Sequence, residues 1–134
     1  MAVVDASIVV RLLLNQDGDQ PLRERFSIER RVHAPALIDA EVTSAIRGLL
    51  MASHPTVNIS AARAEEAVVD YASLPIERHA MLPLQRRALA LRNNFTAYDA
   101  FYVALAELLD LPLLTDDRKY SRAVGHSALI ETWD

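Results

Sequence analysis

The chain has 134 residues, the size of one domain, and 51% of them are apolar, which is enough to build a hydrophobic core. It contains no cysteine, which excludes disulfides, zinc–thiolate sites and thiol nucleophiles, and no apolar stretch approaches the roughly 20 residues that span a membrane. The formal net charge of −4 argues against a protein that coats nucleic acid through a basic surface, although a catalytic centre rich in carboxylates accords with it.

The apolar pattern predicts strands that alternate with helices along the chain. Ser7, Ser60 and Thr96 are suited to cap helices, and Pro35 suits the first turn of another. In chain order we expect a strand over 2–4, helices over 8–14 and 20–28, a strand over 32–34, helices over 35–51 and 61–71, a strand over 80–84, helices over 85–92 and 97–109, a strand over 112–115, a short helix over 119–124 and a strand over 128–131.

This alternation predicts an α/β fold with a mostly parallel central sheet flanked by helices, in three α/β/α layers. No internal repeat or shift in composition divides the chain, so we expect a single domain over residues 1–134. No basic leader precedes the first strand, and we therefore expect a cytoplasmic protein with no membrane association.

Acidic residues stand where an acid is out of keeping with the apolar residues around it. Asp5 ends the first predicted strand, Glu41 and Asp99 lie in helices with apolar neighbours, and the pair Asp116 and Asp117 follows a later strand. Buried carboxylates are unfavourable unless they are paired or bound to a cation, and several together raise one another's pKa. Because strand ends and helix starts meet at one edge of a parallel sheet, these acids predict a common metal site.

Each acid also has a purely structural interpretation. Asp5 could cap the helix over 8–14, although Ser7 competes for that position and would leave Asp5 free. Asp99 lies three residues after Thr96, where a capping box would place it, and a helix dipole favours Glu41. One acid of the pair after Thr115 is expected to cap the next turn while the other faces the site.

An all-oxygen ligand set predicts a hard ion, Mg²⁺ or Mn²⁺, and disfavours zinc. The four histidines show no metal-ligand spacing, and we expect ordinary surface or half-buried side chains at His33, His54, His79 and His126.

Four segments together resemble the acidic motifs of PIN domains, specifically of VapC toxins from bacterial type II toxin–antitoxin pairs. These segments are 3–7, 35–42, 96–106 and 113–117, and the third is the most specific match. In order and spacing the resemblance covers essentially the whole chain. The last acid of that family usually follows the Ser or Thr by two residues, which corresponds to Asp117 and leaves Asp116 as an extra or alternative ligand.

The resemblance implies a metal-dependent endoribonuclease that an antitoxin inhibits. Asp5 and Asp99 would hold the divalent ion, with Glu41 and Asp117 as further ligands or bound through water, so that these four are the candidate catalytic residues. Glu41 is the candidate for orienting or deprotonating the attacking water. Ser7 and Thr115 could hydrogen-bond the ligand carboxylates. Arg47 is the candidate RNA contact, with Arg11, Arg86, Arg87 and Arg92 as further candidates unless they are merely solvated.

We also expect an RNA substrate, a homodimer, and a heteromeric complex with a VapB-type antitoxin. The apolar helices over 8–14 and 38–51 offer more apolar surface than a small sheet covers, which favours association. In the family that the chain resembles, antitoxins fold around such a surface and often place a basic side chain in the acidic pocket.

Three alternatives remain at this point. Aspartyl-phosphate chemistry would use Asp5 as nucleophile, but the second acid that phosphatases or receiver domains need is absent beside it, although Lys119 could serve as a late lysine. A nucleotide binder would need a glycine-rich loop, and Gly18, Gly48 and Gly125 are not clustered. An inactive PIN-like scaffold would tolerate losing the acids, and all of them are present.

Overall fold

A computed structural model describes residues 1–133, and its centre is a five-stranded sheet in which every neighbouring pair is parallel. The strand order is β3-β2-β1-β4-β5. The strands are β1 Ala2–Val4, β2 Val32–Pro35, β3 Ile76–His79, β4 Leu113–Thr115 and β5 Ile130–Thr132. The predicted α/β class with a central parallel sheet is confirmed.

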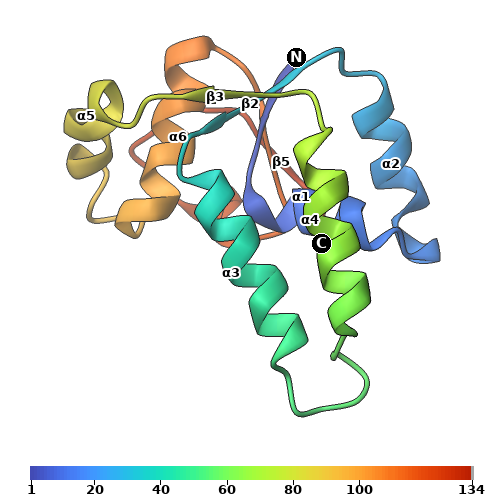
Figure 1. Ribbon diagram of the computed structural model, residues 1–134. Coiled ribbons are helices and arrows are strands. Elements are labelled where there is room, and N and C mark those ends of the chain that lie inside the picture. The colour runs from blue at the N-terminus through green and yellow to red at the C-terminus, as the bar shows by residue number, and fades with distance from the viewer. Residues whose placement is uncertain (134) are drawn as a thin grey trace.

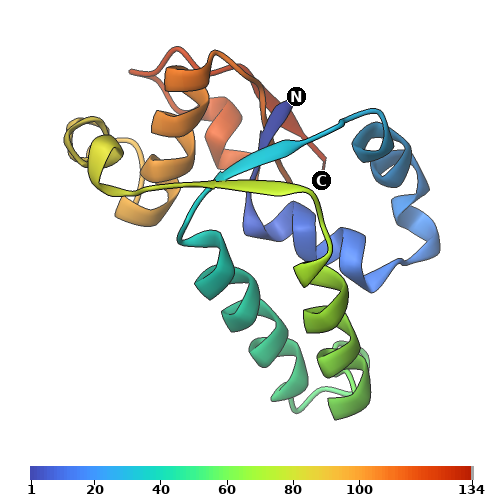
Figure 2. The same cartoon turned by 45° about the horizontal axis from the view of Figure 1, so that its top comes forward.

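Helices cover both faces of this sheet and complete the predicted three layers (Figures 1 and 2). They are α1 Ala6–Leu14, α2 Gln20–Ser27, α3 Ile38–Leu50, α4 Ala61–Ala72, α5 Gln85–Ala90, α6 Ala97–Leu109 and α7 Lys119–Arg122, with short 3-10 helices at Asp17–Asp19 and Leu82–Leu84. Helices α1, α3 and α4 pack on one another, and α6 packs along β1, β2 and β4. No helix among residues 1–133 is long and apolar enough to cross a membrane.

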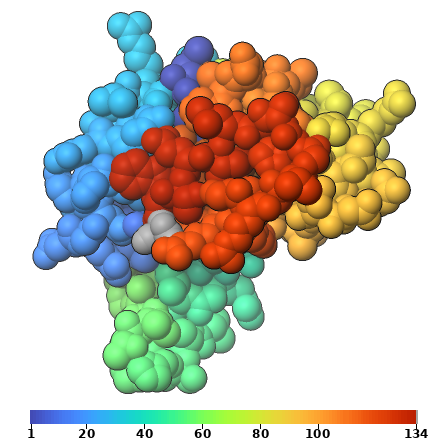
Figure 3. All heavy atoms as spheres, turned by 180° about the vertical axis from the view of Figure 1, so that it is seen from behind, coloured from blue at the N-terminus to red at the C-terminus, as the bar shows by residue number. Residues whose placement is uncertain are grey.

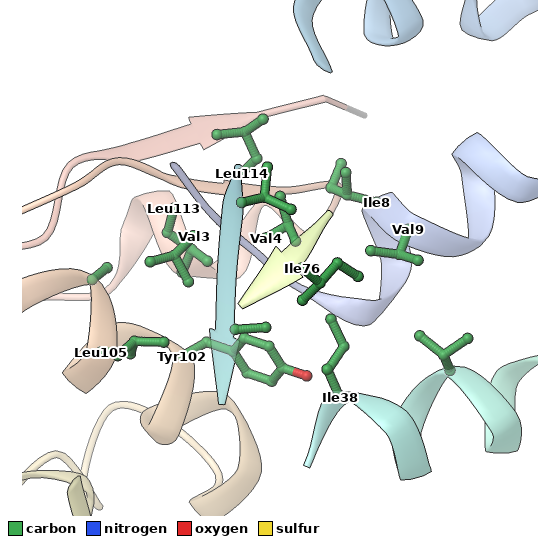
Figure 4. Close-up of a cluster of buried hydrophobic side chains, with 14 of the residues drawn as sticks. Val3, Val4, Ile8, Val9, Ile38, Ile76, Tyr102, Leu105, Leu113 and Leu114 are labelled. Atoms are coloured by element: carbon green, nitrogen blue, oxygen red, sulfur yellow. The ribbon is translucent and has the colours of Figure 1, made fainter. Parts of the chain in front are cut away.

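The two faces of the sheet can be assigned from the strand register. Val3 pairs with Leu113 and Val4 with Leu114, and successive side chains on a strand point to opposite faces. Val3 and Leu113 therefore share one face while Val4 and Leu114 share the other, and all four are completely buried. Figure 4 shows this core, with Leu105 of α6 toward the first face and Ile8 of α1 toward the second.

Helices α3 and α4 form an arm that projects from the body of the molecule (Figure 1). The arm joins β2 to β3, and its tip lies far from the sheet. Seen from behind, the C-terminal segment lies between α2 and α5, above the arm (Figure 3). The base of the arm, where α3 begins, adjoins the carboxyl ends of the strands.

Two element predictions were wrong. The third strand lies at Ile76–His79, not at residues 80–84, where a 3-10 helix containing Pro83 begins at Leu82. Only Ile76 of this edge strand is buried, so the strand carries little apolar signal. Pro35 ends β2 and pairs with His79, and α3 starts three residues later. The remaining elements agree with the prediction to within a few residues at their ends.

Candidate active site

The predicted acids gather around one cavity of about 180 Å³ at the carboxyl ends of β1 and β4. The chain leaves β1 toward β2 on one side, while β4 lies on the other side of β1. This point, where the strand order reverses, is where ligands bind in open α/β sheets. The cavity is lined by Asp5, Ala6, Ser7, Glu41, Asp99, Tyr102, Asp116, Asp117 and Tyr120.

Asp5 is the most buried of these acids and is held by three donors. Its Oδ1 accepts hydrogen bonds from the Ser7 hydroxyl at 2.5 Å and from the Ile8 backbone N–H at 3.2 Å. Its Oδ2 accepts the Thr115 hydroxyl at 2.5 Å. Asp5, not Ser7, therefore caps α1, which corrects the prediction. Ser7 and Thr115 do contact the Asp5 carboxylate, as expected.

Burial is the main reason that the pKa of Asp5 rises from 3.8 to about 6. The hydrogen bonds from Ser7, Thr115 and Ile8 lower it, and the charge of Asp116 raises it further. A carboxylate at this position is poorly solvated in the folded protein and gains from a nearby cation.

Glu41 enters the cavity from the first turns of α3. Its Oε1 accepts a hydrogen bond of 2.6 Å from the hydroxyl of Tyr102 on α6. Burial raises the pKa of Glu41, the hydrogen bond from Tyr102 lowers it, and the charge of Asp99 raises it. The neighbouring acid Asp39 instead faces away, bound to Arg78 at 2.8 Å and to the Tyr71 hydroxyl at 2.7 Å.

Asp99 is paired with the only lysine of the chain. The ammonium of Lys119 lies 2.8 Å from Asp99 Oδ2 and 3.2 Å from Asp117 Oδ2. The side chain of Thr96 makes no cap hydrogen bond, so the alternative capping-box interpretation of Asp99 is wrong. The two carboxylates raise the pKa of Lys119, with the Asp99 hydrogen bond as the largest cause, and Lys119 is therefore a cation at neutral pH.

Asp116 and Asp117, which follow β4, both line the cavity, and Asp117 also makes hydrogen bonds that shape the turn. Asp117 Oδ1 accepts the backbone N–H of Lys119 at 3.0 Å, which fixes the turn before α7, while its other oxygen meets the Lys119 ammonium. The backbone N–H of Asp117 donates to Thr115 Oγ1 at 3.1 Å. Asp117 thus combines the turn-forming and site-facing roles that were expected of separate residues.

The structure does not bring the predicted arginines to this cavity. Arg47 is exposed on α3, on the stripe of Asp39 and Thr43 and away from Glu41. Arg11 is bound to Asp19 at 2.6 Å, and Arg87 to Glu107 at 2.8 Å. Arg92 donates to the Leu89 carbonyl, and Arg86 is exposed; neither lines the acidic cavity.

A second, larger cavity of about 660 Å³ adjoins the acidic one and shares Ala6, Ser7 and Glu41 with it. Its other lining residues are Leu37, Ala40, Ser44, Ala45, Met81 and Tyr98. Tyr98 is 64% exposed although it directly precedes Asp99. The acidic cavity therefore opens onto a mainly apolar surface at the base of the arm.

The acidic cavity offers only oxygen ligands and already accommodates one positive charge, the Lys119 ammonium. No three carboxylates among the described residues bring oxygens within 4.8 Å of one another there. This donor set fits a hard divalent ion. Asp5 is buried, and the other four acids around the cavity are half-buried.

Sequence reasoning missed two residues that line this cavity, Tyr102 and Tyr120. It also missed that Lys119 pairs with two of the acids. Tyr102 lies one helical turn after Asp99 and therefore on the same side of α6, which was a usable signal. Burial and the charges of Asp99 and Asp5 raise the pKa of Tyr120, which therefore stays neutral. The sequence suggested a role for Lys119 only in the alternative of aspartyl-phosphate chemistry.

The histidines were expected to be ordinary surface or half-buried side chains, and for His33, which is buried, this is wrong. His33 Nδ1 lies 2.9 Å from His79 Nε2, because β2 and β3 pair side by side. Residues 46 positions apart carry no visible metal-ligand spacing, so this proximity was hidden until the strand register was known.

The chain is similar to known proteins over nearly its whole length. The sequence model of the PIN domain matches residues 2–125. The chain is 40% identical over 131 residues to Ribonuclease VapC12 of Mycobacterium tuberculosis, covering 98% of both sequences. It is 37% identical over 121 residues to Ribonuclease VapC9 of that organism, covering 90% of this chain and 89% of the relative. Its fold is similar to a chain in the crystal structure of VapBC2 from Rickettsia felis bound to a promoter DNA fragment, with a TM-score of 0.69, 12% identity, and coverage of 99% and 98%.

Proposed function

This chain belongs to the PIN domain family, and on that premise we propose that it is a metal-dependent endoribonuclease, the toxin of a type II toxin–antitoxin pair. The observation that carries the proposal is the set of acids around one cavity at the reversal point of a parallel sheet. The names of its relatives, which are VapC ribonucleases over almost the same length, support RNA as the substrate. We also propose that residues 1–134 form one domain.

In this proposal Asp5 and Asp99 hold one Mg²⁺ or Mn²⁺ ion, with Asp117 as the preferred further ligand and Asp116 as the alternative. The ion, when bound, supplies a positive charge that polarises the scissile phosphate and lowers the pKa of the attacking water. Ser7 and Thr115 fix the orientation of the Asp5 carboxylate through their two short hydrogen bonds. This support keeps one ligand in place before the ion arrives.

Glu41 is the proposed group that orients or deprotonates the water. Its raised pKa makes it a better proton acceptor than an ordinary surface glutamate. The Tyr102 hydroxyl holds one carboxylate oxygen, so the other oxygen remains available to the water. Because Lys119 bridges one oxygen of Asp99 and one of Asp117, its ammonium would compete with the ion for these oxygens. Once displaced, it would be free to pair with an RNA phosphate.

The proposed partners are a VapB-type antitoxin, which inhibits the protein, and a second copy of the chain, which forms a homodimer with it. The proposed substrate is RNA, and the proposed location is the cytoplasm. The apolar cavity that shares Glu41 with the acidic centre is suited to an apolar segment of the antitoxin. A basic antitoxin side chain would pair with the same acids that bind the ion. Inhibition should therefore weaken when Mn²⁺ is raised at constant ionic strength.

The function is tested by incubating total RNA with the purified protein and mapping the 5′ ends of the products. We expect cleavage with Mg²⁺ or Mn²⁺ and none after chelation by EDTA. Asp5→Asn should lose cleavage while its circular dichroism spectrum stays unchanged. Asp70→Asn, an exposed acid on α4 outside both cavities, is the matched control and should cleave like the wild type. Cleavage that persists in EDTA or in Asp5→Asn would refute the proposal.

A further inference from the structure

A second cluster of possible metal ligands lies on the sheet, away from the acidic cavity. His33 of β2 pairs in register with Glu77 of β3, and His79 follows Glu77 by two residues. Parallel partners and alternate residues of a strand point to the same face, so all three side chains share one face of the sheet. It is the face of Val3 and Leu113, because Val3 pairs with His33.

The three side chains converge on one point. His33 Nδ1 lies 2.9 Å from His79 Nε2 and 3.6 Å from Glu77 Oε2, and the three ligand atoms all lie within 4.8 Å of one another. Two ligands of an ion with bonds of about 2.0 to 2.1 Å lie about 2.9 to 3.4 Å apart at angles of about 90° to 109°. No other group of three His, Cys, Asp or Glu residues within 1–133 meets the same 4.8 Å limit.

His33 is buried, and the polar contacts of its ring are with this cluster. Only 8% of the residue is exposed, and its Nε2 is buried without a hydrogen-bond partner among the described residues. Both polar contacts of the ring, with His79 and Glu77, are made by Nδ1. Nδ1 is therefore the ring atom that faces the other two side chains.

Two of the three side chains are accessible to solvent. Glu77 is exposed, and His79 is half-buried at the end of the edge strand. The competing cation is Arg31, whose guanidinium donates to Glu77 Oε2 at 3.3 Å. Arg31 has 61% of its side chain exposed and can turn into solvent. The N-terminal ammonium, a further positive charge that acts on His33, is already paired with Glu29.

We propose that His33, Glu77 and His79 form a binding site for a divalent transition-metal ion such as Zn²⁺, Co²⁺ or Ni²⁺, separate from the acidic centre. Two imidazoles and one carboxylate are borderline ligands, which suit these ions better than Mg²⁺. Three protein ligands leave at least one position for water. The bound ion would link β2 to the edge strand β3. These are the two strands that the arm connects, and the arm carries Glu41.

The two sites can be separated by using untagged protein with the substitutions Asp5→Asn and Asp99→Asn, which removes the proposed ligands of the acidic cavity. We expect one equivalent of Zn²⁺ to bind to this protein in isothermal titration. Co²⁺ should give a visible absorption spectrum that Zn²⁺ abolishes and that tenfold Mg²⁺ leaves unchanged. The melting temperature should rise with Zn²⁺, because the ion binds only the folded protein.

Three variants in that background test the ligands. His79→Gln and Glu77→Gln change exposed or half-exposed positions and should each weaken Zn²⁺ binding at least tenfold while the protein stays folded. His33→Gln should do the same, and the other two variants decide the question if it does not fold. His54→Gln, on the exposed turn after α3, is the control and should bind Zn²⁺ like its parent. Absence of Zn²⁺ binding, which would leave a hydrogen-bonded histidine pair only, or undiminished binding in His79→Gln and Glu77→Gln, would overturn the proposal.

Discussion

The acidic cavity and the histidine cluster are two groups of titratable side chains on the same sheet, assembled in different ways. The acids lie in turns and in the first turns of helices, and they surround a space of about 180 Å³. The histidine cluster lies on the strands themselves, where the register brings its ligand atoms within 4.8 Å. Charged carboxylates repel one another unless a cation lies between them, whereas two neutral imidazoles can form a hydrogen bond.

This difference predicts which ion each site prefers. The acidic cavity combines charged oxygen donors with a lysine that already acts as counter-ion, so it suits a hard, exchangeable ion. The histidine cluster offers nitrogen donors with little negative charge, so it suits a transition metal.

Loss of catalysis should be confined to the acidic cavity. We expect Asp99→Asn to reduce RNA cleavage by at least about 100-fold, since it removes a proposed charged ligand of the ion. His79→Gln should leave the rate of cleavage within about twofold of the wild type at saturating Mg²⁺. Single-turnover rates on one defined RNA measure both. Equal losses in the two variants would mean that the two clusters act as one site.

The stability of the metal-free protein should depend on the charge of Asp5. Its folded-state pKa of about 6 lies above the ordinary 3.8, so the carboxylate is protonated in the folded protein at pH 4 and charged, at a loss of stability, above pH 6. We expect Asp5→Asn to be more stable than the wild type by about 3 kcal/mol at pH 8 and to show no gain below pH 4. Urea unfolding in EDTA at both values measures this difference. A gain that is largest at pH 4 would contradict the assignment.

Lys119 should compete with the ion. Its ammonium occupies the carboxylates of Asp99 and Asp117, and Lys119→Met would free them. We expect the affinity for Mn²⁺ to rise by about fivefold to tenfold, which corresponds to about 1 kcal/mol, the strength of a partly exposed ion pair. Titration followed by the electron paramagnetic resonance signal of free Mn²⁺ measures the affinity. Arg122→Met, in the same helix, is the control, and weaker Mn²⁺ binding in Lys119→Met would show that the lysine positions the ligands.

The smallest effect is expected for the hydroxyl that holds Glu41. Tyr102→Phe keeps the buried ring and removes the 2.6 Å hydrogen bond. We expect cleavage to fall by about threefold to tenfold, since one hydrogen bond to a charged group is lost while Glu41 keeps partial solvation. Because that bond lowers the pKa of Glu41, the acidic limb of the pH–rate profile should shift to higher pH in the variant. An unshifted profile would remove Glu41 from the proposed proton transfer.

The acids could be found from the sequence because each of them breaks a local pattern. Asp5 ends a buried strand and Asp99 interrupts an apolar helix, and both features are visible within ten residues. The Asp5 hydrogen bonds could not be assigned in the same way. Ser7 and Asp5 are both good helix caps, and the choice between them was decided by Thr115, which lies 110 residues away and fixes the other oxygen of Asp5.

The order of the elements and the place of the acidic centre were thus determined by sequence, since helix periodicity, caps and strand ends are local properties of the chain. Tertiary structure alone decided the position of β3, an edge strand with one buried residue, and with it the register that joins His33 to Glu77 and His79. It also decided that Lys119 turns back onto Asp99 and Asp117. Such contacts depend on backbone hydrogen bonds and on burial between segments that are far apart in the sequence. The free energy of these interactions cannot be read from the pattern of residues within one segment.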